Sequence, residues 1–135
     1  PEAGDLMITG VGTIGIPYVV KKSDEFYFKD ASVLIFKNRS RIVPEYLYHL
    51  FSSESCRRLI HDESKGTTVD TLTIVRANEI PVPLPPLGEQ KRIVAKIEEL
   101  FSELEAGEAS LRKARRQLAV YRQSLLKQAF EGKLT

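Results

Sequence analysis

The chain contains two regions that differ in the spacing of their apolar residues. In the first, short apolar or β-branched runs alternate with glycine and proline, a pattern typical of short strands joined by tight turns. The predicted strands lie within residues 5–13, 18–20, 32–36 and 71–75. Between the last two runs, a stretch that opens with Pro44 has apolar residues near helical spacing and predicts one or two helices. The first region is therefore expected to be α+β.

A proline cluster separates the two regions. Residues 81–86 contain Pro81, Pro83, Pro85 and Pro86, a density that excludes helix and favours an extended chain. The sequence therefore predicts a boundary here, with one domain over residues 1–86 and a separate helical element over residues 87–135.

The second region is a long helix with a heptad repeat. It opens at Gly88-Glu89-Gln90 and runs without proline to Phe130. Its apolar seam is narrow and sustained over about five heptads, which is typical of a coiled coil rather than of a globular helix. Gly107 could mark a hairpin turn, but the repeat passes through it unbroken and an interior glycine costs only about 1 kcal/mol. One continuous helix is expected. Its predicted pairing residues are Ile93, Ile97, Leu100, Leu104, Leu111, Leu118 and Leu125.

The charges on this helix are separated along its length. Acidic residues outnumber basic ones up to Glu108, whereas from Ala109 onward a series of Arg and Lys faces only Glu131. A parallel pair of such helices would bring like charges together, and an antiparallel pair would place acidic halves beside basic halves. The pattern favours antiparallel pairing. The alternative is a solvated helix with incidental blocks of charge.

Composition limits the classes of protein that fit. With 135 residues, 42% hydrophobic and 28% charged, the chain has room for one packed domain and a long accessory element, but not for a large multidomain enzyme. No apolar run is long enough to span a bilayer, so a cytoplasmic protein with no membrane association is expected. The chain starts at Pro1 and almost at once enters a strand-like run, which suggests that it comes from a larger protein.

No catalytic or metal-binding constellation is recognisable. The single Cys56 lies in a predicted helix, where a half-buried thiol is expected, and His49 and His61 form no ligand cluster. Residues 10–15 match G-x-G-x-x-G, but Pro17 and a strand-like run follow where a dinucleotide-binding motif requires a helix. Tight turns between strands explain these glycines better. Neither catalysis nor a bound metal is therefore expected.

Two loops carry residues suited to DNA contact, because Arg and Lys bind phosphate while amides and hydroxyls bind backbone or base edges. The predicted DNA-binding residues are Lys37, Asn38, Arg39 and Arg41 in one loop and Lys65, Gly66, Thr67 and Thr68 in the other. For either loop the alternative is an ordinary solvated turn. Residues 1–86 hold ten basic and eleven acidic side chains, so their net charge gives DNA binding only weak support.

Several segments resemble the specificity subunits of type I restriction-modification systems. Residues 80–94 (IPVPLPPLGEQKRIV) are similar to the junction at which a target recognition domain of that family passes into a conserved spacer helix. The ending SLLKQAFEGKLT resembles the close of that helix. Residues 4–9, 12–15 and 65–68 are similar to the distal half of a recognition domain.

The resemblance implies a non-catalytic subunit that recognises double-stranded DNA. In this family two recognition domains each recognise half of a bipartite target, and two antiparallel helices set the spacing between them. Methylation subunits, which bind S-adenosylmethionine, and motor-nuclease subunits complete the complex, so the specificity subunit needs no cofactor of its own. This sequence departs from the pattern, since it holds one spacer helix and only the distal half of a recognition domain is expected in it. It is therefore expected to be a fragment, a split or half-sized subunit, or one side of a natural truncation.

Pairing of two copies would restore the two-helix spacer, so an antiparallel homodimer is one hypothesis. A coiled-coil dimerisation module with no nucleic-acid role is the alternative, and a nucleotide-binding enzyme that uses residues 10–15 is a third reading.

Overall fold

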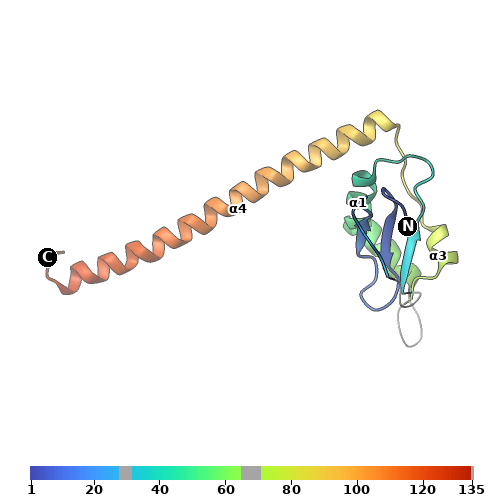
Figure 1. Cartoon of the computed structure of the whole chain (residues 1–135). Coiled ribbons are helices and arrows are strands. Elements are labelled where there is room, and N and C mark those ends of the chain that lie inside the picture. The colour runs from blue at the N-terminus through green and yellow to red at the C-terminus, as the bar shows by residue number, and fades with distance from the viewer. Residues whose placement is uncertain (28–31, 65–70, 135) are drawn as a thin grey trace. The chain divides into compact units, whose positions relative to one another are not determined.

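The computed structural model describes residues 1–27, 32–64 and 71–134. The chain divides into two compact units, Pro1–Val94 and Ala95–Thr135. The elements are β1 (Leu6–Thr9), β2 (Pro17–Val19), β3 (Val33–Phe36), α1 (Pro44–Ser52), α2 (Glu54–Ser64), α3 (Ile74–Glu79) and α4 (Leu87–Phe130), as Figure 1 shows. The predicted α+β class, with a small mixed domain followed by a long helix, is confirmed.

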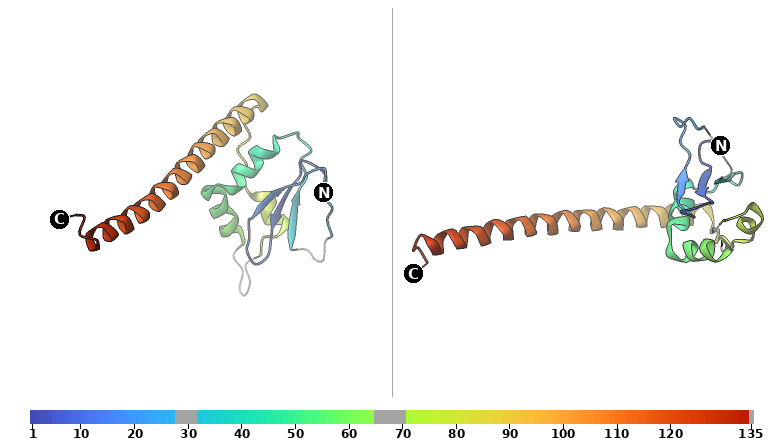
Figure 2. Two further views of the ribbon diagram at one scale, coloured as in Figure 1. Left: turned by 60° about the vertical axis from the view of Figure 1, so that its left-hand side comes forward. Right: turned by 90° about the horizontal axis from the view of Figure 1, so that it is seen from below.

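The sheet has three antiparallel strands in the order β2-β1-β3. Leu6 lies opposite Val19 and Phe36, and Ile8 lies opposite Leu34, so these apolar side chains share one face. They form a core with residues of α1 and α2, and Figure 2 shows both helices beside the sheet. The sheet therefore has a face that is buried by the helices, while alternate residues lie on the opposite face.

Helices α1 and α2 follow from the spacing of their apolar residues. Pro44 occupies the first turn of α1, where its missing N–H costs nothing. Leu47 and Phe51 are buried one turn apart. In α2, Cys56 and Ile60 repeat the spacing of four residues and are likewise buried. The helices predicted after Pro44 are confirmed, and they number two.

The predicted strand at residues 71–75 is wrong. Thr71 forms only an isolated bridge with Val11, and the chain then turns into α3. The reason is local, since the Thr73 side chain accepts a hydrogen bond from the Arg76 N–H and caps the helix. Ile74 and Val75 are exposed, so their β-branched side chains do not contribute to the core of a sheet. The other three predicted strands are confirmed, although the first is shorter and ends at Thr9.

Helix α4 is continuous over 44 residues, and Gly107 lies inside it, so the prediction of an unbroken helix is confirmed. From Ala95 to Leu134 all side chains are exposed except those of Ile97 and Leu125, which are half-buried. Within the described ranges, no helix combines the length and the apolar character needed to cross a bilayer.

Three hydrogen bonds hold the proline segment and the first turn of α4 within the first unit. The Tyr46 hydroxyl donates to the Pro83 carbonyl at 2.7 Å. The Gln90 amide, in a residue that is 4% exposed, donates to the Pro85 carbonyl at 2.8 Å and accepts the Val43 N–H at 2.9 Å. A single side chain of α4 thus joins the residue that precedes α1 to the end of the proline segment.

Replacing Gln90 by Leu keeps the size of the side chain but leaves the Val43 N–H and the Pro85 carbonyl without this partner. Buried polar groups that lose their hydrogen bonds typically cost about 1–3 kcal/mol. We expect Gln90→Leu to lower the free energy of unfolding in urea by about that amount. Gln123→Leu, at an exposed position of the same helix, is the matched control and should change it by less than about 0.5 kcal/mol. Equal urea midpoints for both variants would contradict the role of Gln90.

Candidate nucleic-acid interface

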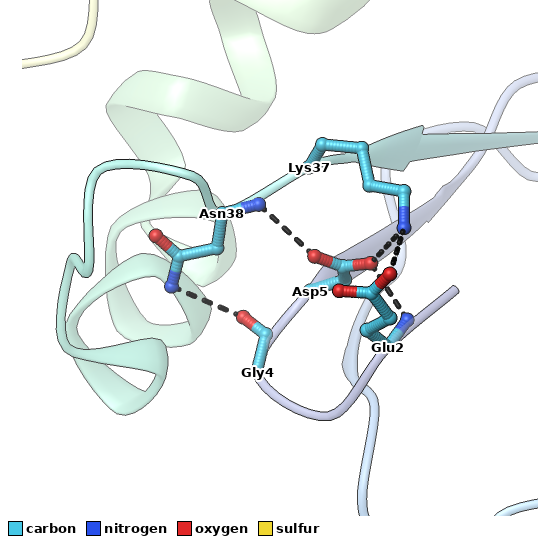
Figure 3. Close-up of polar contacts among 5 residues, drawn as sticks. All are labelled: Glu2, Gly4, Asp5, Lys37 and Asn38. Carbon is cyan, nitrogen blue, oxygen red and sulfur yellow. Dashed lines mark hydrogen bonds and ion pairs between the residues drawn. The ribbon is translucent and has the colours of Figure 1, made fainter.

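The loop that joins β3 to α1 is built on the carboxylate of Asp5. Asp5 lies immediately before β1 and is only 5% exposed. It accepts hydrogen bonds from the Glu2 N–H at 2.7 Å, the Lys37 ammonium at 2.9 Å and the Asn38 N–H at 3.0 Å, and Figure 3 shows this arrangement. The start of the loop is therefore tied to the start of β1.

The hydrogen bonds keep Asp5 ionised. Burial alone raises the pKa of the Asp5 carboxyl, but the bonds from Glu2, Lys37 and Asn38 together outweigh burial and lower the pKa from 3.8 to about 2. The same contact with Asp5 raises the pKa of Lys37. Lys37 also lies 3.8 Å from a carboxylate oxygen of Glu2. The Lys37 ammonium is thus directed to carboxylates of its own chain.

The Asn38 side chain closes the same loop. Its Nδ2 donates to the carbonyls of Gly4 at 3.1 Å and Ile42 at 2.7 Å, and its Oδ1 accepts the Ile42 N–H at 2.9 Å. Both amide donors are therefore used inside the chain. Lys37 and Asn38 have structural partners, and their contact with DNA stays a prediction.

Arg39 and Arg41 are the residues that this framework presents to solvent. Both are exposed, and among the described residues neither guanidinium has a hydrogen-bond or ion-pair partner. Arg41 has a φ of 52°, a left-handed conformation that is rare for a residue with a side chain. The adjacent bonds of Asn38 to Ile42 hold the backbone on either side of it. Two free guanidinium groups on a fixed loop are suited to binding phosphate.

The second predicted loop, with Lys65, Gly66, Thr67 and Thr68, lies outside the described residues. The residues that flank it are described: the Thr71 N–H donates to the Ser64 carbonyl at 2.8 Å, and Thr71 pairs with Val11 just beyond the end of β1. Lys37, in contrast, contacts Asp5 just before β1 begins. The flanks of the second loop and the first loop therefore lie at opposite ends of β1.

The predicted helix-pairing residues differ in exposure. Ile93 packs against the core of the first unit, and Ile97 and Leu125 are half-buried. The exposed members of the set are Leu100, Leu104, Leu111 and Leu118, of which Leu104 and Leu111 are 68% and 72% exposed. These two leucines and Gly107 line one shallow hollow on α4. Since exposed leucines in register along a helix face bury apolar surface only against another element, this face is suited to a partner helix.

Two features argue against other chemistries. Burial raises the pKa of the Cys56 thiol, so Cys56 is not an activated nucleophile. Residues 10–15 form a turn that is closed by the Gly15 N–H donating to the Thr9 carbonyl at 2.8 Å, and they lead into β2. The prediction that these glycines serve a turn between strands is confirmed. Among the described residues, no three His, Cys, Asp or Glu side chains are grouped as metal ligands.

Sequence reasoning did not identify Asp5 or Gln90. Asp5 directly precedes the apolar run of β1, and an acid in that place is a signal of a buried, paired carboxylate. Gln90 is one of several polar residues in the first turns of the helix, and nothing in its spacing distinguishes it from its exposed neighbours.

Asp5→Asn should destabilise the fold in a pH-dependent manner. Because the pKa of folded Asp5, about 2, lies below its ordinary value of 3.8, its ionised form stabilises the fold above that value. This contribution, on the order of 2 kcal/mol, is lost as the pH falls through the folded pKa. In urea unfolding, the difference between the wild-type chain and Asp5→Asn should be largest near neutral pH and shrink toward about pH 2. Glu25→Gln, at an exposed carboxylate, is the control. A difference that does not vary with pH would contradict the assignment.

Comparison with known proteins agrees with the resemblance seen in the sequence. A sequence model of the family described as "Type I restriction modification DNA specificity domain" matches residues 1–111. The chain is 30% identical to the type I restriction enzyme EcoBI specificity subunit of Escherichia coli, over 97% of this chain and 28% of that protein. It is 31% identical to the StySPI specificity subunit of Salmonella potsdam, over 70% of this chain and 20% of that protein.

A third relative, the EcoDI specificity subunit of Escherichia coli, is 28% identical over 88% of this chain and 27% of its own length. The chain therefore spans less than a third of the length of each of these three relatives. Because one family match runs without interruption from the N-terminal turn through the sheet and the proline junction to the middle of α4, the chain belongs to the type I restriction-modification DNA specificity family.

Proposed function

We propose that this chain forms the distal part of a DNA target recognition domain together with the spacer helix of a type I specificity subunit. The observation that carries the proposal is the single family match, which covers the sequence of both the sheet domain and the first half of α4. The Gln90 bonds support it, since they fold the first turn of α4 together with the domain. In this role the chain binds double-stranded DNA and catalyses no reaction.

The first loop is the part of the described domain for which DNA contact was predicted and in which free cationic side chains remain. Arg39 and Arg41 extend from a backbone fixed by Asp5 and Asn38. A fixed backbone reduces the entropy that an arginine loses when it binds phosphate. Phosphate contacts of this kind position a protein on the duplex, whereas base contacts specify the sequence.

The helix pairs with a second helix in antiparallel orientation, and two copies of this chain supply the pair. The seam of α4 has two kinds of position, one occupied by Leu104 and Leu111 and the other by Gly107 and Ala114. In an antiparallel coiled coil, a position of one kind faces a position of the other kind. The register that places Gly107 opposite Leu111 of the second copy also places Leu104 opposite its Ala114, so that each small residue meets a large one. The same register sets the residues up to Glu108 beside the residues from Ser110 onward of the second copy, so the acidic half of each helix lies along the basic half of the other. Both packing and charge thus favour one arrangement.

Ion pairs within α4 do not prevent its charged side chains from pairing with those of a second helix. Glu108 pairs with Arg112 within the helix, and Lys96 pairs with Glu99 at 2.9 Å. All four side chains are more than half exposed, and exposed pairs of this kind contribute at most about 1 kcal/mol. Replacing these ion pairs within one helix by ion pairs between two helices therefore costs little free energy.

The partners of the assembled subunit follow from the family. Methylation subunits, each binding S-adenosylmethionine, and motor-nuclease subunits would dock on the assembled specificity subunit, and the chemistry would take place on them. A symmetric pair of chains would recognise a palindromic, interrupted DNA site.

A second candidate function is a coiled-coil dimerisation module without a nucleic-acid role. The exposed leucines of α4 fit it equally well, and the net charge of residues 1–86 gives DNA binding only weak support. DNA binding by the isolated chain separates the two functions.

Binding of the chain to a labelled duplex should weaken steeply as salt rises, because neutralised phosphates release counterions. The double variant Arg39→Gln and Arg41→Gln should bind more weakly, with a salt slope lower by about one for each phosphate that is no longer neutralised. Fluorescence anisotropy measures both quantities. Arg116→Gln, an exposed position of α4 away from the seam, is the control for loss of charge. If the double variant keeps the wild-type affinity, the first loop does not touch DNA.

Light scattering tests the pairing of α4. We expect the wild-type chain to be a dimer at micromolar concentration, and the double variant Leu104→Ala and Leu111→Ala to be a monomer, since truncating a buried leucine to alanine costs about 2–5 kcal/mol. Val120→Ala removes an aliphatic side chain that is exposed and off the seam, and it should remain dimeric. Added methylation subunit should bind one per chain. A wild-type monomer would refute the homodimer.

A further inference from the structure

A polar groove lies between α2 and the turn of residues 10–15, in the first unit and apart from the first loop. It is lined by Gly12 and Ile14 of the turn and by Glu54, Arg57, Arg58 and His61 of α2. Its volume is about 290 Å³. Since one water molecule takes about 30 Å³, the groove has room for a phosphate group and several waters. The predicted DNA-binding residues do not include any of these side chains.

The groove has a fixed geometry because the turn packs directly on α2. Gly15 is buried, with a φ of 83°, and a Cβ at this position would lie 3.3 Å from Cγ2 of Ile60. Ile60 is 1% exposed. The Ile16 N–H also donates to the Thr9 hydroxyl at 3.0 Å, which closes the turn from the other side. Arg57 and His61, one turn before and one residue after Ile60, are therefore held beside the turn.

The charges of the groove leave a cationic surplus. Arg58 pairs with Glu54 at 3.0 Å, so these two side chains neutralise each other. Arg57 and His61 are exposed, and no side-chain hydrogen bond or ion pair joins either of them to another described residue. An unpaired guanidinium offers a planar set of donors that matches phosphate oxygens, and an imidazole adds one further N–H.

The opposite wall of the groove is open to a close approach. Gly12 has a φ of 76°, and a Cβ added there would meet no atom within 4 Å. A ligand can therefore reach the backbone of the turn without displacing a side chain. The groove has no aromatic ring among its lining residues to stack on a base, and its lining residues from α2 follow one side of that helix from its first residue, Glu54, to His61. These features fit a phosphodiester of a nucleic-acid backbone better than a bound nucleotide.

We propose that this groove binds a phosphate of the DNA backbone, with Arg57 as its cationic contact and the His61 imidazole as a further N–H donor. The inference rests on the proposed function and adds a contact to it. The groove lies at the end of β1 where Val11 pairs with Thr71, whereas Arg39 and Arg41 follow the other end. The domain would then contact the duplex at both ends of the sheet, with the strands setting the separation between the two contacts.

Anisotropy with a labelled duplex in about 100 mM salt tests the groove. The double variant Arg57→Gln and His61→Gln should lose about tenfold in affinity and about one unit of salt slope relative to the wild-type chain. Arg116→Gln on α4 should bind within about twofold of wild type. If the duplex binds the wild type and the double variant equally, the groove does not touch DNA, although the proposed function stands. If the wild type binds no duplex even at low salt, the proposed function itself fails.

A second pair of variants changes only charge. Asp and Asn both tolerate the left-handed conformation of Gly12 and have the same shape. Gly12→Asp places a carboxylate at the wall of the groove and should bind the duplex several-fold more weakly than Gly12→Asn. Equal affinities would overturn the proposal.

Free phosphate is the other source of the same chemistry. Inorganic phosphate, compared with chloride at equal ionic strength, should not raise the melting temperature of the wild-type chain. A rise that Arg57→Gln abolishes would assign the groove to free phosphate and overturn the DNA contact.

Discussion

A carboxylate that is almost fully removed from water must be surrounded by donors, and Asp5 takes its donors from separate parts of the chain. The N-terminal turn supplies the Glu2 N–H, and the end of β3 supplies the Lys37 ammonium and the Asn38 N–H. Removing any of these donors would leave a buried charge poorly compensated, which is among the most costly defects in a fold. The edge strand β3 and the loop after it are thereby fixed to the start of β1, and the exposure of Arg39 and Arg41 depends on this arrangement.

Gln90 is a second buried polar side chain that ties separate segments together, here at the junction between the domain and α4. Its amide is neutral, whereas the Asp5 carboxylate is charged. Its amide satisfies a donor before α1 and an acceptor at the end of the proline segment. Proline has no backbone N–H, so this segment has few donors for pairing with a strand, and side chains of neighbouring elements, Tyr46 and Gln90, bind its carbonyls instead. The first turns of α4 consequently fold with the sheet domain, whereas the leucines of the following part of the helix are exposed.

Local placement of charge matters more here than net charge. The net charge of residues 1–86 is close to zero. Two of their basic side chains form ion pairs within the domain, Lys37 with Asp5 and Arg58 with Glu54. Arg39 and Arg41 at one end of β1 and Arg57 at the other have no carboxylate partner among the described residues, and they lie on parts of the backbone that are fixed by hydrogen bonds or by packing. In a family whose members are DNA specificity domains, the electrostatic footprint would then consist of a few free guanidinium groups rather than a broad basic face.

The sequence by itself determined the periodic elements, the unbroken helix through Gly107, the turn role of the glycines and the family, because spacing and proline content are local properties of the chain. It could not show that Thr73 caps a helix in place of a strand, because β-branched residues favour a strand only when a neighbouring strand is there to pair with them. Nor could it separate Lys37 and Asn38, whose side chains bond within the fold, from Arg39 and Arg41, whose guanidinium groups have no partner among the described residues, although all four occupy one short loop. That distinction, and the placement of Arg57 and His61 beside a distant turn, came only from the tertiary structure, since both depend on which residues far apart in sequence lie together.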